Sequence, residues 1–181
     1  MAPATVMQLA QAGEQTPVAM VAVYPVTTGE QFGESMDDAA DGRPLNRALL
    51  SWMAMHAFEG VPEGAKDPRV DLLGWSDEVR RLMSPTLVIT DERDVLRSQG
   101  QEFARKLQAA GVETSESYYP GAFHEFFGAS AVFELAEQAQ QDAARHIRAA
   151  IGGSATGADP YPAQGGTDAV VVAPASPPGT Q

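Results

Sequence analysis

The sequence has no cysteine, no long apolar run and few positive charges. The absence of cysteine excludes disulfides, thiolate catalysis and cysteine-based zinc sites. No apolar run approaches the ~18 residues of a membrane span, and no basic segment of a secretory signal precedes the first helical pattern. We therefore expect a cytoplasmic protein without a membrane span. The 12 Lys and Arg against 24 Asp and Glu give a net charge of −12, which argues against nucleic-acid partners because these require clustered cations.

The residues that are present suit one folded domain followed by a tail. With 181 residues, 44% of them hydrophobic, the chain can bury a core of useful size. From residue 152 onward Gly, Ala, Pro, Ser and Thr dominate, and no amphipathic period is visible. We therefore predict a folded domain over residues 1–151 and a disordered tail over residues 152–181.

Strand and helix patterns alternate along the domain. Residues 18–24 and 85–90 are apolar on both faces, as in the middle of a parallel sheet, whereas residues 113–119 are more polar and suit a sheet edge. Helical patterns cover residues 4–12, residues 46–58 with Asn46 as cap, residues 98–110 with Ser98 as cap, and residues 131–151. The second of these helices places an apolar side at Leu49, Leu50, Trp52, Met53 and His56. The alternation predicts an α/β fold with about three parallel strands and flanking helices.

Two residues that follow predicted strands are the catalytic candidates. His124 lies in the segment Tyr-Pro-Gly-Ala-Phe-His-Glu after the third strand, and histidine titrates near neutral pH as a general base must. Asp94 follows the second strand, where Asp91 and Glu92 are alternatives on the same loop. An acid followed by a histidine is the end of a Ser…Asp…His order. The remaining histidines are predicted to be structural or solvated: His56 and His146.

The third member of such a triad is missing from the sequence. No serine lies in a Gly-x-Ser-x-Gly turn, the strained turn that exposes the nucleophile in this order. The nearest imitation, Gly-Gly-Ser-Ala-Thr at residues 152–156, lacks the second glycine and has no strand before it. It also follows the histidine instead of preceding the acid. The residues therefore predict a base and its orienting acid without a nucleophile.

Two loops carry a resemblance to a known family. Residues 90–100, Thr-Asp-Glu-Arg-Asp-Val-Leu-Arg-Ser-Gln-Gly, resemble the acid loop Glu-x-Asp-Pro-Leu-Arg-Asp-Glu-Gly of hormone-sensitive-lipase-like esterases among the α/β-hydrolases. The triad acid of that loop maps to Asp94. Residues 119–126 resemble the histidine loop Gly-x-x-His-Gly-Phe, whose base maps to His124. Residues 23–27 and 67–70 are similar to family segments in the same order. The departures are Val95 for the usual Pro and Glu125 for the usual Gly.

The resemblance implies a fold and an activity. Residues 4–12 resemble the helix that follows the family's nucleophile elbow, so the family's Gly-Asp-Ser-Ala-Gly elbow and His-Gly-Gly-Gly oxyanion segment would precede the point where this chain begins. The expected fold is then the C-terminal part of an α/β-hydrolase. The expected activity is hydrolysis of small or medium acyl esters by a Ser-His-Asp mechanism, with no cofactor and no metal.

Two functional hypotheses are compatible with the sequence. In the first, the chain is the acid- and base-bearing part of a carboxylic-ester hydrolase and is inactive when isolated. In the second, it is a truncated hydrolase-like domain that acts as a binding or interaction module. In the resembled fold, the strand leading into the elbow lies beside residues 18–24. The edge of residues 18–24 is therefore predicted to be unpaired and to favour self-association.

Overall fold

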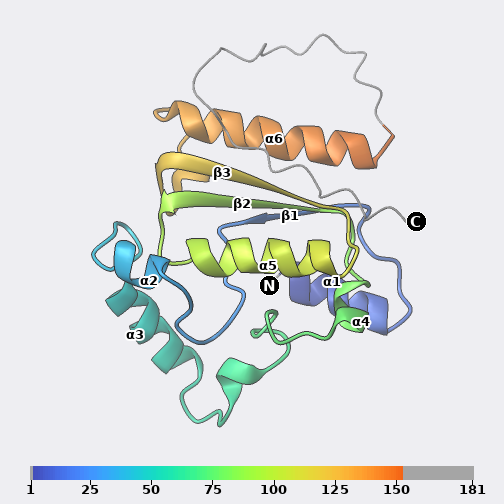
Figure 1. The fold of residues 1–181 in the computed structure, drawn as a ribbon, viewed down its shortest axis with the longest axis horizontal. Coiled ribbons are helices and arrows are strands. Elements are labelled where there is room, and N and C mark those ends of the chain that lie inside the picture. Colours follow the sequence, from blue (N-terminus) through green and yellow to red (C-terminus); the bar gives the residue numbers. More distant parts are fainter. Residues whose placement is uncertain (1, 153–181) are drawn as a thin grey trace, which may run out of the picture.

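The computed structural model describes residues 2–152, so the predicted tail beyond residue 152 lies outside the described residues. Helices and strands alternate along the chain (Figure 1), in the order α1 (Ala2–Gln11), β1 (Met20–Val23), α2 (Ser35–Asp38), α3 (Arg47–Ala57), α4 (Asp77–Arg80), β2 (Thr86–Arg93), α5 (Arg97–Ala109), β3 (Thr114–Phe123) and α6 (Glu134–Ala150). The strands form one parallel sheet in the order β1-β2-β3. This confirms the predicted α/β class.

Helices cover both faces of the sheet, and the core lies in two layers. Helix α6 packs on one face, and α5 and α1 pack on the other (Figure 1). Val88 of β2 and Phe103 of α5 are fully buried on the α5 side. Ile89 of β2 and Ala139 of α6 are fully buried on the opposite side. The unbroken apolar run of β2 is therefore explained by burial on both faces.

Strands β2 and β3 are longer than the sequence pattern predicts. They stay paired from Thr86 and Thr114 to Arg93 and Phe123, with an irregularity between Asp91 and Arg93. The sequence pattern predicts that the third strand ends at residue 119, before a turn formed by Pro120 and Gly121; this is wrong, because residues 120 and 121 lie inside β3. A proline is tolerated there because β3 is an edge strand, whose outer side needs no N–H donor. The polar character of β3 indicated the edge position correctly.

Two helices differ from their predicted environments. Asn46 caps α3 as predicted, since its Oδ1 accepts a hydrogen bond from the Leu49 N–H at 2.8 Å. No residue of α3 is buried, however, and Trp52 is 56% exposed, so the predicted apolar side does not face the core. Helix α5 begins at Arg97, before the predicted cap Ser98. The Ser98 hydroxyl instead accepts a hydrogen bond from the Ser35 N–H at the start of α2.

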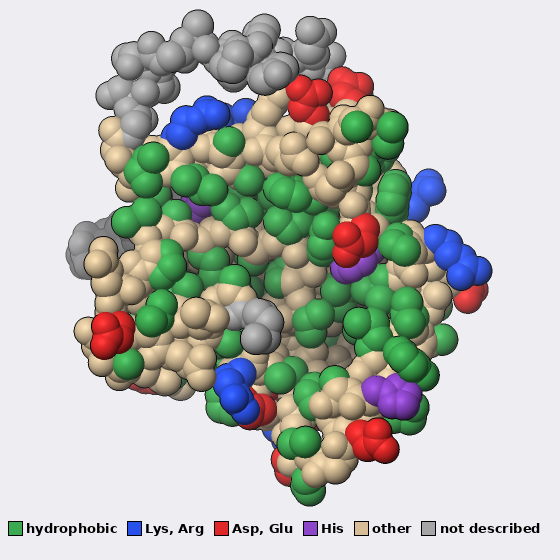
Figure 2. All heavy atoms as spheres, turned by 180° about the vertical axis from the view of Figure 1, so that it is seen from behind, with side chains coloured by type: hydrophobic (Ala, Val, Ile, Leu, Met, Phe, Trp, Pro, Cys, Tyr) green, Lys and Arg blue, Asp and Glu red, His purple; other side chains and the backbone are tan. Residues whose placement is uncertain are grey.

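Strand β1 has one open edge among the described residues. It pairs with β2 through Met20 N to Pro85 O and Tyr24 N to Ile89 O. Because hydrogen bonds to one neighbour come from alternate residues of a strand, the N–H and C=O groups of Val21 and Val23 point away from β2. The face on the β1 side carries many hydrophobic side chains (Figure 2).

In the described part of the chain, no helix is long and apolar enough to cross a membrane.

We expect the chain to self-associate through the open edge of β1. Unpaired strand edges flanked by valines are templates for pairing with another chain. Size-exclusion chromatography over a range of concentrations should show dimers or larger species despite the charge of −12. A concentration-independent monomer whose amides are protected from hydrogen exchange at Val21 and Val23 would contradict this expectation.

Candidate active site

The structure brings Asp94 and His124 together at the carboxyl end of the sheet. Each is the first residue after its strand, directly beyond the paired residues Arg93 and Phe123. His124 Nδ1 lies 2.8 Å from Asp94 Oδ2. Asp94 Oδ1 accepts a second hydrogen bond from the Leu96 N–H at 2.9 Å. The Asp94 side chain is 1% exposed and that of His124 is 14% exposed, so the carboxylate is fixed in a dry position against the imidazole.

Opposing effects act on the protonation of His124. Burial of the imidazole acts to lower the pKa of His124, because a buried charge loses its hydration. The hydrogen bond to Asp94 and the charges of Asp94, Asp91 and Glu125 act to raise it, and the net pKa is above the ordinary value of 6.5. The ring is therefore a stronger base than a free histidine. Such a group can accept a proton near neutral pH.

Tyr24 packs on the imidazole from the end of β1. Its ring centroid lies 4.5 Å from that of His124, at an interplanar angle of 50°. Its φ of 33° places the backbone in the left-handed region, which costs free energy for a side chain of this size. Burial, followed by the charges of Glu125, Asp91 and Asp94, raises the pKa of Tyr24 to about 12. The hydroxyl therefore stays neutral, and the ring restricts where His124 can move.

Glu125 stands beside the other imidazole nitrogen. Its Oε1 lies 3.7 Å from His124 Nε2, and its side chain is 65% exposed. The φ of Glu125 is 74°, a left-handed value that glycine adopts without strain. This left-handed backbone conformation explains why the resembled histidine loop has a glycine at this position. In this chain an exposed carboxylate takes that place next to Nε2.

Asp91 is a second buried carboxyl near the pair. It is 0% exposed, and neither of its oxygens has a hydrogen-bond partner among the described residues. Burial, and next the charge of Asp94, raises the pKa of Asp91 from 3.8 to about 7. Sequence reasoning treated Asp91 as a competitor of Asp94 for contact with the histidine. The structure instead places Asp94 against His124. Asp91 lies close enough to interact electrostatically with both Asp94 and His124.

The other histidines lie apart from this site. The His56 ring packs on Trp52, with ring centroids 4.5 Å apart, on the exposed side of α3. His146 was expected to be solvated, but its Nε2 lies 3.2 Å from the Pro85 carbonyl oxygen. A ring N–H can donate to that carbonyl, so His146 links α6 to the start of β2. No cluster of three or more metal-ligating side chains is found within residues 2–152.

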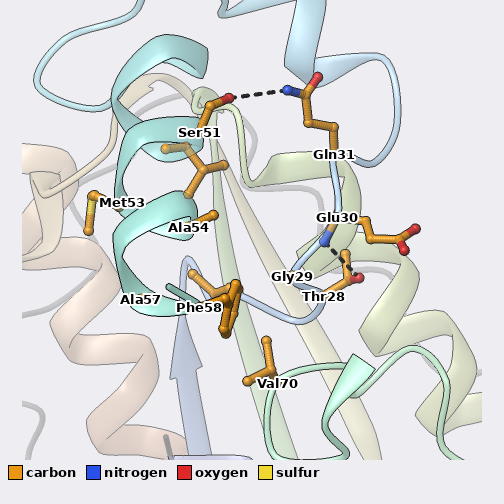
Figure 3. Close-up of a pocket in the computed structure, with 12 residues that line it drawn as sticks. Thr28, Gly29, Glu30, Gln31, Ser51, Met53, Ala54, Ala57, Phe58 and Val70 are labelled. Carbon is orange, nitrogen blue, oxygen red and sulfur yellow. Dashed lines mark hydrogen bonds between the residues drawn. The ribbon is translucent and has the colours of Figure 1, made fainter. Parts of the chain in front are cut away.

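An apolar cavity of about 230 Å³ lies between α3 and the segment that follows β1. That segment starts directly after Tyr24, so the cavity is at the same end of the sheet as His124. Gln31 Nε2 donates a hydrogen bond to Ser51 Oγ at 3.2 Å and ties the segment to α3 (Figure 3). Apolar side chains form most of the wall, among them Val26, Leu50, Met53, Ala54, Phe58 and Val70. The cavity can therefore accept an apolar group.

Comparison with known proteins agrees with the fold and the loops. A sequence profile described as alpha/beta hydrolase fold matches residues 1–128. The chain belongs to the alpha/beta-hydrolase family. Its parallel strands, with an acid and a histidine after successive strands, have the order expected of that family.

The relatives of this alpha/beta hydrolase include esterases. The chain is 32% identical over 123 residues to an ethyl acetate hydrolase of Pseudomonas putida. The matched region is 67% of this chain and 37% of the relative. It is 28% identical over 147 residues to a carboxylesterase/phospholipase of Mycobacterium tuberculosis, and this match covers 78% of the chain and 36% of the relative. The chain thus spans about a third of the length of the curated relatives it matches.

Solved structures of alpha/beta hydrolases share this arrangement. An alpha/beta hydrolase from the metagenome of Lake Arreo is 31% identical with a TM-score of 0.71, covering 82% of this chain and 46% of that one. An esterase of the archaeon Pyrobaculum calidifontis has a TM-score of 0.75 at 24% identity, and the match covers 81% of this chain and 48% of that one. The latter supports the fold alone.

Sequence reasoning missed two residues of the site. The sequence pattern places Tyr24 in a strand and does not predict its contact with His124, although an aromatic residue followed by a proline at a strand end is a signal for it. The sequence presents Asp91 only as an alternative to Asp94. Its burial depends on tertiary packing, which no local sequence pattern reveals.

Proposed function

We propose that this chain supplies the acid and the base of a carboxylic-ester hydrolase. His124 is the proposed general base and Asp94 the residue that orients it. The observation that carries the proposal is the 2.8 Å contact between His124 Nδ1 and Asp94 Oδ2. That contact leaves Nε2 as the nitrogen that takes a proton from a serine hydroxyl and returns it to the leaving alcohol.

The proposed substrates are small or medium acyl esters. The apolar cavity of about 230 Å³ beside α3 supports this size, since it is smaller than the ~300–1,000 Å³ typical of sites for drug-sized ligands. The Pseudomonas putida relative is named for hydrolysis of ethyl acetate, which agrees with a short acyl group. An acyl or alkyl chain would lie between the α3 side chains and Val26, where apolar contacts replace water.

The isolated chain is expected to lack esterase activity. Its sequence contains no Gly-x-Ser-x-Gly turn, so His124 has no serine to activate. General-base assistance to water alone gives only about 10²–10⁴-fold acceleration. Hydrolysis of p-nitrophenyl acetate by the purified chain should therefore equal that of its His124→Ala variant. Turnover that depends on His124 would contradict this expectation and would require another nucleophile.

A chimaera tests the proposed roles directly. In it, this chain replaces the part of the Pseudomonas putida ethyl acetate hydrolase that it matches, and the remaining part of the relative supplies the nucleophile that the resemblance implies. We expect the chimaera to hydrolyse p-nitrophenyl acetate and its His124→Ala variant to fall to the uncatalysed rate. A matched His56→Ala variant should keep full activity. A chimaera whose activity does not depend on His124 would refute the assignment.

A further inference from the structure

Asp91 is a buried carboxyl that the proposed mechanism does not use. It lies in β2, three residues before Asp94, and is 0% exposed. No donor among the described residues bonds to Oδ1 or Oδ2, and the Asp94 carboxyl is the side chain close enough to share a hydrogen bond with Asp91 once one of the two carries a proton. A buried ionised carboxylate without a donor is costly, because nothing replaces its lost hydration. The structure therefore has to satisfy Asp91 in another way.

The charged and titratable groups around Asp91 do not neutralise it as an anion. Asp94 adds a like charge, while His124 and Arg97 are the cations that act on it. Arg97 is engaged elsewhere: its Nη2 lies 2.7 Å from Asp38 Oδ2, and its Nη1 donates to the Glu92 carbonyl. His124 Nδ1 is directed at Asp94. The charge of Asp91 also contributes to raising the pKa values of two neighbouring phenols, Tyr24 and Tyr118.

Two carboxyl groups can share a hydrogen bond only when one of them carries a proton. Asp94 already accepts hydrogen bonds at both oxygens, from His124 and from the Leu96 N–H. Both bonds need Asp94 as the acceptor, whereas Asp91 accepts no hydrogen bond from a donor of the described residues. A carboxylate has about four lone-pair sites, so Asp94 can accept a third hydrogen bond. Asp91 is therefore the member of the pair that is suited to keep the proton.

We propose that Asp91 is a positioning residue, which keeps its proton up to the neutral range and, while protonated, donates a hydrogen bond to the Asp94 carboxylate. This role rests on the proposed function of Asp94 and His124. The protonated Asp91 fixes the Asp94 side chain from a third direction and adds no charge. When Asp91 loses its proton, a second negative charge appears beside the imidazole. That charge holds the proton on His124 and makes the ring less available as a base.

The proposal makes the site a coupled system of three groups. Asp91 and His124 influence each other's protonation on either side of Asp94, so their titration steps belong to the cluster. The raised pKa of Asp91, which burial and the charge of Asp94 together produce, agrees with a proton held close to neutral pH. The charge of ionised Asp91 acts to raise the pKa of His124. Asp91 therefore links the protonation of His124 to the pH around neutrality.

Nuclear magnetic resonance of the full chain tests this proposal without any esterase activity. The carboxyl carbon of Asp91 is followed between pH 3 and pH 9, together with the Hε1 proton of His124. We expect Asp91 to titrate near pH 7 and His124 to report the same step. In Asp91→Asn that step should vanish from His124, and the pKa of His124 should fall. Titration of Asp91 near 3.8 in the unmutated chain would overturn the proposal, even if the variant failed to fold.

A second variant separates this inference from the proposed function. Asp94→Asn removes the carboxylate that orients His124, so the downfield Nδ1 proton signal of the Asp94–His124 hydrogen bond should disappear. In Asp91→Asn the same signal should persist. If Asp94→Asn leaves the signal and the pKa of His124 unchanged, the proposed pair itself is wrong. If only the Asp91 titration fails to appear near neutrality, the pair stands and the role of Asp91 is wrong.

Discussion

Asp94→Asn lowers the kcat of the active chimaera by roughly 10⁴-fold, the loss that follows the same change in a serine-protease triad. The Asp94 carboxylate can only accept, so it requires a proton on His124 Nδ1 and leaves Nε2 free as the base. An asparagine amide can donate to Nδ1 instead and so reverse the tautomer. Nε2 then carries the proton and cannot take another from serine.

The measurement is steady-state kinetics of p-nitrophenyl acetate hydrolysis at pH 8. We expect KM to change little, because Asp94 is 1% exposed and does not face the cavity beside α3. Exposed Asp41 provides the control, and Asp41→Asn should keep kcat within about twofold of the parent. A folded Asp94→Asn chimaera with less than tenfold loss would show that another group orients His124.

Asp91→Asn stabilises the chain by up to about 4 kcal/mol at pH 8 and by almost nothing at pH 4. The pKa of Asp91 is raised from 3.8 to about 7 in the folded chain, and a difference of this size corresponds to roughly 4 kcal/mol. Between these two values the folded state binds more protons than the unfolded state. The free energy of unfolding of the parent therefore falls as the pH rises from 4 to 7, and the loss is complete above the folded pKa.

Asparagine removes this loss because its amide carries no charge at any pH. Urea unfolding of the parent and of Asp91→Asn at pH 4, 6 and 8 gives the free energy of unfolding and its pH dependence. Asp41→Asn, at an exposed position, should follow the parent at each pH. An Asp91→Asn variant that is destabilised at pH 8, or that gains equally at pH 4, would show that folding does not raise the pKa of Asp91.

The sequence was sufficient for the fold class because the strand signals are strong. The apolar run of β2 is buried on both faces, as such a run requires, and the polar pattern of β3 matches its edge position. Asp94 and His124 could be selected because each follows a strand and each lies in a loop of familiar pattern. Whether they meet depends on the register of β2 and β3, which the sequence does not state.

Other features depend on tertiary contacts that no local pattern reveals. The apolar residues of α3 predicted a buried side, yet Trp52 and Met53 of that side are 56% and 49% exposed. Ser98 has the residue type of a helix cap, but Asp94 Oδ1 already accepts the Leu96 N–H at that terminus. The Ser98 hydroxyl is then free to accept from Ser35. Likewise, the burial of Asp91 follows from packing and not from its neighbours in the chain.

The position of Asp94 and His124 directly after two paired strands has a consequence for how this protein can evolve. Inserting or deleting one residue within β2 or β3 would turn the following side chain to the opposite face of the sheet, and the acid and the base would part. Length changes in the turn between α5 and β3 leave the pairing of Arg93 with Phe123 intact. Descendants of this chain should therefore vary in length at that turn and around α3, while the spacing from Thr86 to Asp94 and from Thr114 to His124 stays constant.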